Sequence, residues 1–421
     1  MKTKAVRLYG KEDLRLEEFE LPAIGSGEIL AKIVSDSICM SSFKAAEQGA
    51  AHKRVPDNVA EKPVIIGHEF CGEIIEVGAE WASEFKPGDK FSIQPALNYQ
   101  GSLAAPGYSY QYIGGDATYV VIPREVMLQK CLLPYKGEAF FYGSLAEPMS
   151  CIVGAYHAMY HTTNGVYRHE MEIKAGGNLA ILAGVGPMGL GAIDYAIHGP
   201  VKPKFLVVTD IDDARLARAA SLLTVEEAAK NGITLKYLNT GKSCADPVAA
   251  LLELTGGKGY DDVFCFAPVR PVVEQGDRIL GRDGCLNFFA GPLDPNFRAE
   301  FNFYNVHYAS THIVGTSGGN TDDMKESLRL MEQGLLNPAA MVTHVGGLNA
   351  VIPTTLNLPN IKGGKKLIYT QIEMELTAIA DFAEKGKSDP FFAELAAICE
   401  RHNGLWSAEA EKALLAHFKQ C

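Results

Sequence analysis

The chain has 421 residues, 47% of them apolar and 21% charged, and its formal net charge at pH 7 is -11. This length exceeds the size at which one hydrophobic core stops growing, so we expect two domains, with or without an appendage. Because nucleic-acid-binding proteins usually carry a basic patch and have a high isoelectric point, the acidic balance argues against nucleic acid as a partner.

The nine cysteines are far apart and none forms a C-x-x-C pair, so we expect neither a disulfide framework nor a four-cysteine zinc site. The first twenty residues lack the apolar core of a signal peptide, and no stretch approaches the length of a membrane span. The expected protein is soluble and cytoplasmic, with reduced thiols and no membrane partner. The cysteines are Cys39, Cys71, Cys131, Cys151, Cys244, Cys265, Cys285, Cys399 and Cys421.

From Met1 to about Pro123, short apolar alternations are interrupted by Gly and Pro, as in GEIIEVGAEWASEFKPGDKFSI. This pattern predicts a β-rich barrel or sandwich with frequent turns. A polar pair, His68 and Glu69, interrupts one apolar run. Because an unpaired buried carboxylate is costly, this pair is expected either to make ordinary hydrogen bonds or to face a cation.

From about Leu145, the pattern changes to helix-length segments that alternate with short apolar runs: NLAILAGVG, KFLVVTD, DDVFCFA, GCLNFFAG and HIVGTSGG. This alternation predicts an α/β domain with a parallel, doubly wound sheet. After Gly319 we expect a helix over TDDMKESLRLMEQG and strand-like chain that ends in KKLIYTQI. In the tail from Glu373, apolar residues three and four apart in ELTAIADFA and FFAELAAICERH predict helices.

A glycine motif marks a candidate cofactor site. Gly184, Gly186 and Gly189 form G-x-G-x-x-G directly after a predicted strand and at the start of a helix, where such glycines allow close approach of a pyrophosphate. Asp210 ends the next strand and can accept both ribose hydroxyls, which favours NAD over NADP, although Arg215 could reach a 2'-phosphate. The alternative is a glycine-rich turn with a solvated Asp. Pro187 and Met188 complete the predicted cofactor contacts.

Four residues are candidate metal ligands. Cys39, His68 and a carboxylate, either Glu69 or Glu147, could form an open Zn2+ site with three protein ligands and a fourth position for water or substrate. Other residues near these motifs have simpler interpretations. Cys71 and Cys151 are expected to be small core residues, and His157 and His161 to be ordinary helix or loop residues.

The order GSGEILAKIVSDSIC, GHEFCGEIIEVG, FKPGDKF, AEPMS, AGVGPMGLGA and GTSGG closely resembles the zinc-dependent medium-chain dehydrogenases, particularly their polyol dehydrogenase branch. The resemblance extends from Met1 to about Tyr369. It implies a GroES-like β-rich catalytic domain, a Rossmann NAD-binding domain and a helical C-terminal extension. The implied limits are 1–160 and 319–370 for the two parts of the catalytic domain, 161–318 for the Rossmann domain and 371–421 for the extension.

By this resemblance, Cys39 and His68 match the family's zinc ligands. Glu69 and Glu147 match two carboxylates that either bind the zinc directly or hold its water, and Glu69 is therefore also a candidate catalytic residue. Ser41 matches the hydroxyl that begins a proton relay. The stretch SIQPALNYQGSLAAPGYSYQYIGGDA lacks the four cysteines of a second, structural zinc site, so we expect one zinc per chain.

The resemblance also implies a substrate pair, a ketose phosphate and a polyol phosphate, L-sorbose 1-phosphate and glucitol 6-phosphate. Lys44, which stands where many relatives have His, is the strongest candidate for a phosphate contact because it follows a zinc ligand by five residues. His52, Lys53 and Arg54 supply further basic groups, although a solvated loop is the simpler interpretation of Lys53 and Arg54. The alternatives are an unphosphorylated polyol dehydrogenase and a non-catalytic nucleotide-binding protein.

We expect a homo-oligomer, a dimer or a tetramer.

Overall fold

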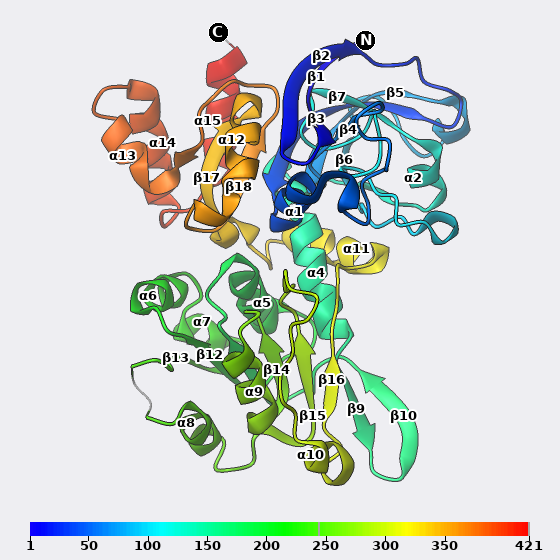
Figure 1. Cartoon of the computed structure of the whole chain (residues 1–421). Helices are drawn as coiled ribbons and strands as arrows, with labels where there is room; N and C mark the ends of the chain where they lie inside the picture. The colour runs from blue at the N-terminus through cyan, green and yellow to red at the C-terminus, as the bar shows by residue number, and fades with distance from the viewer. Residues whose placement is uncertain (243–244, 420–421) are drawn as a thin grey trace. The chain divides into compact units, whose positions relative to one another are not determined.

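The computed structural model describes residues 1–242 and 245–419, so Cys244 and Cys421 lie outside the described residues (Figure 1). Contacts within the chain define two compact units. Unit 1 contains Met1–Pro148 and Val342–Cys421, and unit 2 contains Met149–Met341. The domain limits expected from the sequence, at residues 160, 318 and 370, stay a proposal for where the catalytic domain, the Rossmann domain and the extension meet.

Unit 1 is β-rich, as predicted. Its main sheet has the strand order β19-β17-β18-β3-β5-β6-β8, with β7 also paired to β3, and a smaller sheet has the order β2-β1-β4. Strand β3 is buried over almost its whole length because it lies inside the main sheet. The strands are β1 (Lys2–Gly10), β2 (Asp13–Glu20), β3 (Ile29–Ile38), β4 (Val64–Ile65), β5 (Phe70–Val77), β6 (Lys90–Ile93), β7 (Tyr119–Ile122), β8 (Leu132–Pro134), β17 (Val342–Gly347), β18 (Lys365–Tyr369) and β19 (Thr377–Ala378).

The C-terminal extension is helical, but it does not begin with a helix. The predicted helix over ELTAIADFA is wrong at its start, where β19 pairs antiparallel with β17. The open edge of β17 offers backbone hydrogen bonds that a local helical preference does not outweigh. The helices of unit 1 are α1 (Met40–Gln48), α2 (Arg124–Leu128), α3 (Phe140–Ser144), α12 (Val351–Leu356), α13 (Phe382–Lys385), α14 (Pro390–Arg401) and α15 (Ala408–Lys419).

The extension packs on the rest of unit 1 through a series of buried hydrogen bonds. The indole Nε1 of Trp406 donates to the Tyr369 hydroxyl at 2.7 Å, and that hydroxyl donates to Glu411 at 2.8 Å. The same carboxylate accepts the backbone N–H groups of Phe140 at 2.6 Å and Phe141 at 2.9 Å. These are the first amides of α3, which have no partner inside a helix. Glu411 therefore caps α3 from a distant part of the sequence.

Unit 2 contains a parallel sheet with the order β13-β12-β11-β14-β15-β16, the strand order of a doubly wound dinucleotide-binding fold. All five strands predicted in this region are confirmed, whereas β9, β10 and β13 were not predicted. The strands are β9 (Tyr160–Thr163), β10 (Val166–Met171), β11 (Asn178–Leu182), β12 (Phe205–Asp210), β13 (Thr234–Asn239), β14 (Tyr260–Cys265), β15 (Leu280–Phe288) and β16 (His312–Val314).

Helices alternate with the strands of unit 2, and the predicted helix after Gly319 is confirmed as α11 (Figure 1). Within the described part of the chain, no helix is long and apolar enough to cross a membrane. The remaining helices are α4 (Ala146–His157), α5 (Pro187–His198), α6 (Asp213–Leu222), α7 (Val225–Lys230), α8 (Pro247–Leu254), α9 (Arg270–Ile279) and α10 (Phe303–Tyr308), and α11 spans Thr321–Glu332.

Candidate metal and cofactor sites

Three of the predicted metal ligands lie together in unit 1. Cys39 follows β3 and precedes α1, while His68 and Glu69 immediately precede β5. Because β3 and β5 pair antiparallel, the end of one strand lies beside the start of the other. One ligand atom from each of Cys39, His68 and Glu69 lies within 4.8 Å of the other two. Main-chain pairing thus brings together residues that are far apart in the sequence.

The His68 ring is surrounded by hydroxyl groups. Its Nε2 lies 3.2 Å from the Ser41 hydroxyl and 3.2 Å from the Tyr108 hydroxyl, and its Nδ1 lies 3.3 Å from the Ser42 hydroxyl. Ser41 also donates to Cys39 Sγ at 3.2 Å. The thiol and the Nε2 atom therefore face the same small space, and Ser42 orients the ring from the other side.

Glu69 is held by a buried lysine. Lys365 Nζ donates to both carboxylate oxygens, at 2.5 and 2.6 Å, and Ser37 donates to one of them at 2.5 Å. Burial by itself would raise the pKa of Glu69, but the charges of Lys365 and His68 and the hydrogen bonds from Lys365 and Ser37 together outweigh burial and lower it. Lys365 was not predicted, because nothing in GGKKLIY indicates which lysine faces Glu69. Tyr108 was also missed, within a stretch considered only for its lack of cysteines.

Glu147 lies in the first turn of α4 and is not one of the three mutually close donors. Burial, followed by the charge of Glu69, raises its pKa to about 7, and burial also raises the pKa of Cys39. Both groups lose their protons more readily beside a cation. A thiol, an imidazole nitrogen and two carboxyl groups are a donor set suited to Zn2+, so the residues present fit this metal.

The glycine motif of unit 2 lies at the start of α5. A Cβ at Gly189 would lie 2.2 Å from the Gly184 carbonyl oxygen, and one at Gly184 would lie 2.4 Å from Ile181 Cγ2, so both glycines permit close helix–strand packing. At Gly186, the nearest atom to such a Cβ is Arg215 Nη2 at 3.4 Å. Gly186 also precedes α5 without a side-chain cap. The first amides of α5 are therefore open to an anion.

A cavity of about 390 Å³ lies at this motif, entirely within unit 2. Asp210 ends β12, and its Oδ1 accepts the backbone N–H groups of Ile211 at 2.8 Å and Asp212 at 3.1 Å. These bonds orient the carboxylate in the cavity, so the residues fit a dinucleotide. Of the predicted contacts, Gly186, Pro187, Met188, Gly189, Asp210 and Arg215 line the cavity and Gly184 does not. Thr209, Thr240 and Phe266 also line it but were not predicted.

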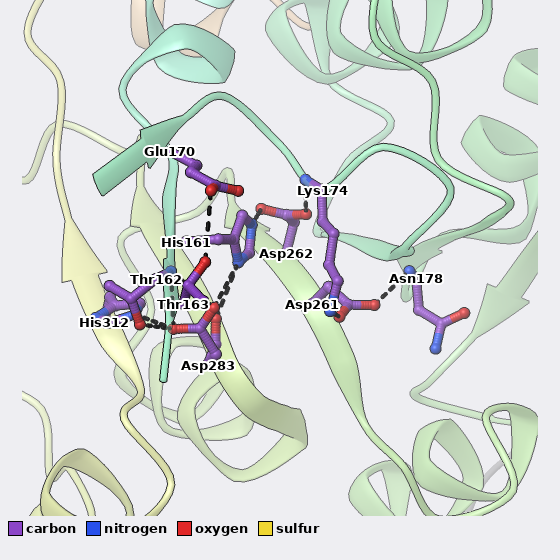
Figure 2. Close-up of polar contacts among 10 residues, drawn as sticks. All are labelled: His161, Thr162, Thr163, Glu170, Lys174, Asn178, Asp261, Asp262, Asp283 and His312. Atoms are coloured by element: carbon purple, nitrogen blue, oxygen red, sulfur yellow. Dashed lines mark hydrogen bonds and ion pairs between the residues drawn. The ribbon is translucent and has the colours of Figure 1, made fainter. Parts of the chain in front are cut away.

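The two histidines set aside as ordinary residues have carboxylate partners in unit 2. His157 Nδ1 lies 2.7 Å from Asp323. His161 lies between two acceptors, with Nε2 3.0 Å from Asp262 and Nδ1 3.0 Å from the Asp283 carbonyl oxygen (Figure 2). Both ring nitrogens of His161 face oxygen acceptors, so the protonated ring, with two N–H donors, satisfies both. Asp283 also lies 2.8 Å from His312, so this network holds β9 to the sheet.

Two sequence families match the chain. The profile described as "Alcohol dehydrogenase GroES-like domain" matches residues 25–132, and the one described as "Zinc-binding dehydrogenase" matches residues 187–333. The chain belongs to this zinc-binding alcohol dehydrogenase family, and it is an alcohol or polyol dehydrogenase. The expected fold class and family are therefore confirmed, and the alternative of a non-catalytic nucleotide-binding protein is dropped.

Three relatives are similar over 99% of this chain and 98% of their own length. The chain is 57% identical to the uncharacterized protein YggP of Escherichia coli (strain K12). It is 56% identical to mannitol-1-phosphate 5-dehydrogenase of Aliivibrio fischeri and 52% identical to L-sorbose 1-phosphate reductase of Klebsiella pneumoniae.

Solved structures share the fold. A 2R,3R-butanediol dehydrogenase from Bacillus subtilis is 22% identical, with a TM-score of 0.69, over 87% of this chain and 99% of its own. A zinc-binding dehydrogenase from Sinorhizobium meliloti, bound to NADP, is 21% identical, with a TM-score of 0.70, over 88% and 100% of the two chains.

Proposed function

We propose that this protein is a zinc-dependent NAD(H) oxidoreductase that interconverts a ketose phosphate and a polyol phosphate, with L-sorbose 1-phosphate and glucitol 6-phosphate as the specific pair. The observation that carries the proposal is the convergence of Cys39, His68 and Glu69 within 4.8 Å. The relatives named for sugar-phosphate or polyol-phosphate substrates, at 56% and 52% identity, support the substrate class.

In the proposed mechanism, Cys39, His68 and a carboxyl group hold the metal. Zinc, when bound, acts as a Lewis acid towards oxygen, and the nicotinamide carries the hydride. Ser41 takes up or releases the substrate proton in this mechanism, which is supported by the 3.2 Å distances from its hydroxyl to Cys39 Sγ and His68 Nε2. Lys365 offsets the charge of Glu69. Glu147 is the second candidate for the carboxylate that binds the metal.

The first prediction concerns the metal. Cys39→Ala should abolish zinc binding and reduce turnover to about 1% of wild type or less, because the thiolate is a principal donor. Elemental analysis and an NADH assay with L-sorbose 1-phosphate measure the two effects. Cys399→Ala, which removes a buried thiol of α14, is the matched control and should retain both zinc and activity. A Cys39→Ala protein that keeps its zinc and its rate would refute the metal assignment.

A second prediction concerns cofactor choice. We expect kcat/KM to be at least about tenfold higher with NADH than with NADPH, since the Asp210 carboxylate repels a 2'-phosphate. Asp210→Ala should narrow this difference, and Arg215→Ala should widen it if Arg215 contacts the phosphate. Both residues line the same cavity. A wild-type preference for NADPH would contradict the prediction and would indicate that Arg215 determines the choice of cofactor.

The proposal includes a cytoplasmic homo-oligomer, a dimer or a tetramer. Large apolar side chains are exposed together on two elements of unit 2: Tyr167 on β10, and Phe303, Tyr304 and Tyr308 on α10. Exposed aromatic groups of this kind mark interaction surfaces in many proteins. Sedimentation velocity of the full chain tests the assembly.

A further inference from the structure

A group of basic side chains lies beside the metal donors in unit 1. Helix α1 begins directly after Cys39 and carries Lys44, which is half-buried. The chain then turns, and His52 N–H bonds to the Gly49 carbonyl oxygen at 3.0 Å. Burial, followed by the charges of Arg54, Lys53 and Lys44, lowers the pKa of His52. The segment expected to bind phosphate therefore concentrates positive charge instead of dispersing it.

Arg54 is the most firmly placed member of this group. Its backbone carbonyl accepts the Ser109 hydroxyl at 2.6 Å, and its amide donates to His52 Nδ1 at 3.3 Å. Its guanidinium carbon lies 5.4 Å from the centre of the Tyr108 ring, against which His52 also stacks. Among the residues that the structure describes, no carboxylate forms an ion pair with Arg54. A half-buried guanidinium with five donors thus lacks an anionic partner.

Tyr108 connects this guanidinium to the metal donors. Its hydroxyl lies 3.2 Å from His68 Nε2, and its ring centre lies 4.8 Å from the His68 ring centre. The distances from the Tyr108 ring centre to the His68 ring centre and to the Arg54 guanidinium carbon are both known. The His68 ring centre and the guanidinium carbon therefore cannot be farther apart than the sum of these two distances. In L-sorbose 1-phosphate the phosphate is on the carbon next to the keto carbon, so the phosphorus lies three single bonds of about 1.5 Å each, or roughly 4 Å, from the reacting carbon. A sugar held at the metal donors can therefore place its phosphate against Arg54.

We propose that Arg54, supported by Tyr108, binds the phosphate of the substrate and selects phosphorylated over unphosphorylated sugars. The inference rests on the proposed function, in which this site acts on a sugar phosphate. Arg54 offers a planar pair of donors that matches phosphate oxygens, and Lys44 adds charge nearby. Arg54, rather than Lys44, is thus the principal specificity residue, which reverses their expected order of importance.

The test compares kcat/KM for L-sorbose 1-phosphate and L-sorbose in wild type and Arg54→Gln. The variant should lose about 10- to 100-fold with the phosphorylated sugar and little with L-sorbose. Inorganic phosphate should inhibit the wild type competitively and the variant more weakly. Arg54→Lys should recover part of the loss. Arg15→Gln is the matched control, because Arg15 also lies over a tyrosine ring, that of Tyr9 at 4.1 Å, but pairs with Asp13.

The outcomes separate the inference from the proposed function. If wild type does not distinguish the two sugars, the phosphorylated substrate itself is wrong. If wild type prefers L-sorbose 1-phosphate and Arg54→Gln keeps that preference, the role of Arg54 is overturned while the proposed function stands. An equal loss with both sugars, or a loss of zinc, would identify Arg54 as a structural residue and would also overturn the inference.

Discussion

At the scale of single residues, two of the candidate metal ligands depend on neighbours that the motifs do not contain. Glu69 is paired with Lys365, and His68 is contacted by Tyr108. The motif GHEF identifies the two donors because they are adjacent in the sequence. Lys365 is 296 residues from Glu69, and its role depends on the pairing of β18 with β3. Partners of this kind follow from strand register, which the local sequence does not encode.

His161 gives a prediction of pH dependence. Burial alone would lower its pKa, but the hydrogen bond to Asp262 and the charges of Asp262 and Asp283 outweigh burial and raise it. A raised folded-state pKa means that the protonated ring stabilises unit 2. This stabilisation is complete below the unfolded-state pKa of about 6.5 and is lost as pH rises through the folded-state value.

The measurement is native-state hydrogen exchange of the β9 amides across this pH range. After correction for the intrinsic effect of pH on exchange, the protection of the β9 amides in wild type should fall as the His161 ring loses its proton. His161→Asn should show lower protection that no longer depends on this titration. His307→Asn, which replaces an exposed histidine of α10 in the same unit, should behave as wild type. Equal pH profiles for wild type and His161→Asn would contradict the prediction.

At the scale of elements, the extension contributes stability through Glu411. Glu411→Ala leaves the Phe140 and Phe141 amides and the Tyr369 hydroxyl without their acceptor, which should cost about 3 kcal/mol of unit 1 stability. Both tryptophans of the chain, Trp81 and Trp406, lie in unit 1, so urea unfolding followed by tryptophan fluorescence reports on this unit.

The control for Glu411 is Glu409, two residues away on the same helix. Its carboxylate pairs with Arg401 and His402 on the surface, and such exposed pairs contribute little to stability because water and salt screen them. Glu409→Ala should therefore leave the urea midpoint nearly unchanged. If both variants shift the midpoint equally, the α3 cap is not the source of the stabilisation.

At the scale of the whole molecule, the sequence predicted the architecture better than the details of the site. The glycine motif and the strands around it were correct, because a strand, a tight turn and a helix follow one another within a short stretch. The helix over ELTAIADFA was wrong because β17 offered a pairing edge. The contact between Arg54 and Tyr108 was not predicted, because it joins two loops whose approach no local pattern reveals.

Unit 1 consists of two segments that unit 2 separates in the sequence, so the two segments are synthesised at different times. Cys39, His68 and residues 35–38 of β3 leave the ribosome before unit 2, whereas β18 follows it. Since domains fold as units during synthesis, unit 2 can fold while β3 still has an open edge. Lys365 reaches Glu69 only after β18 is added. The Glu69 carboxylate of a nascent chain therefore lacks the lysine that balances its charge until the second segment of unit 1 has been made.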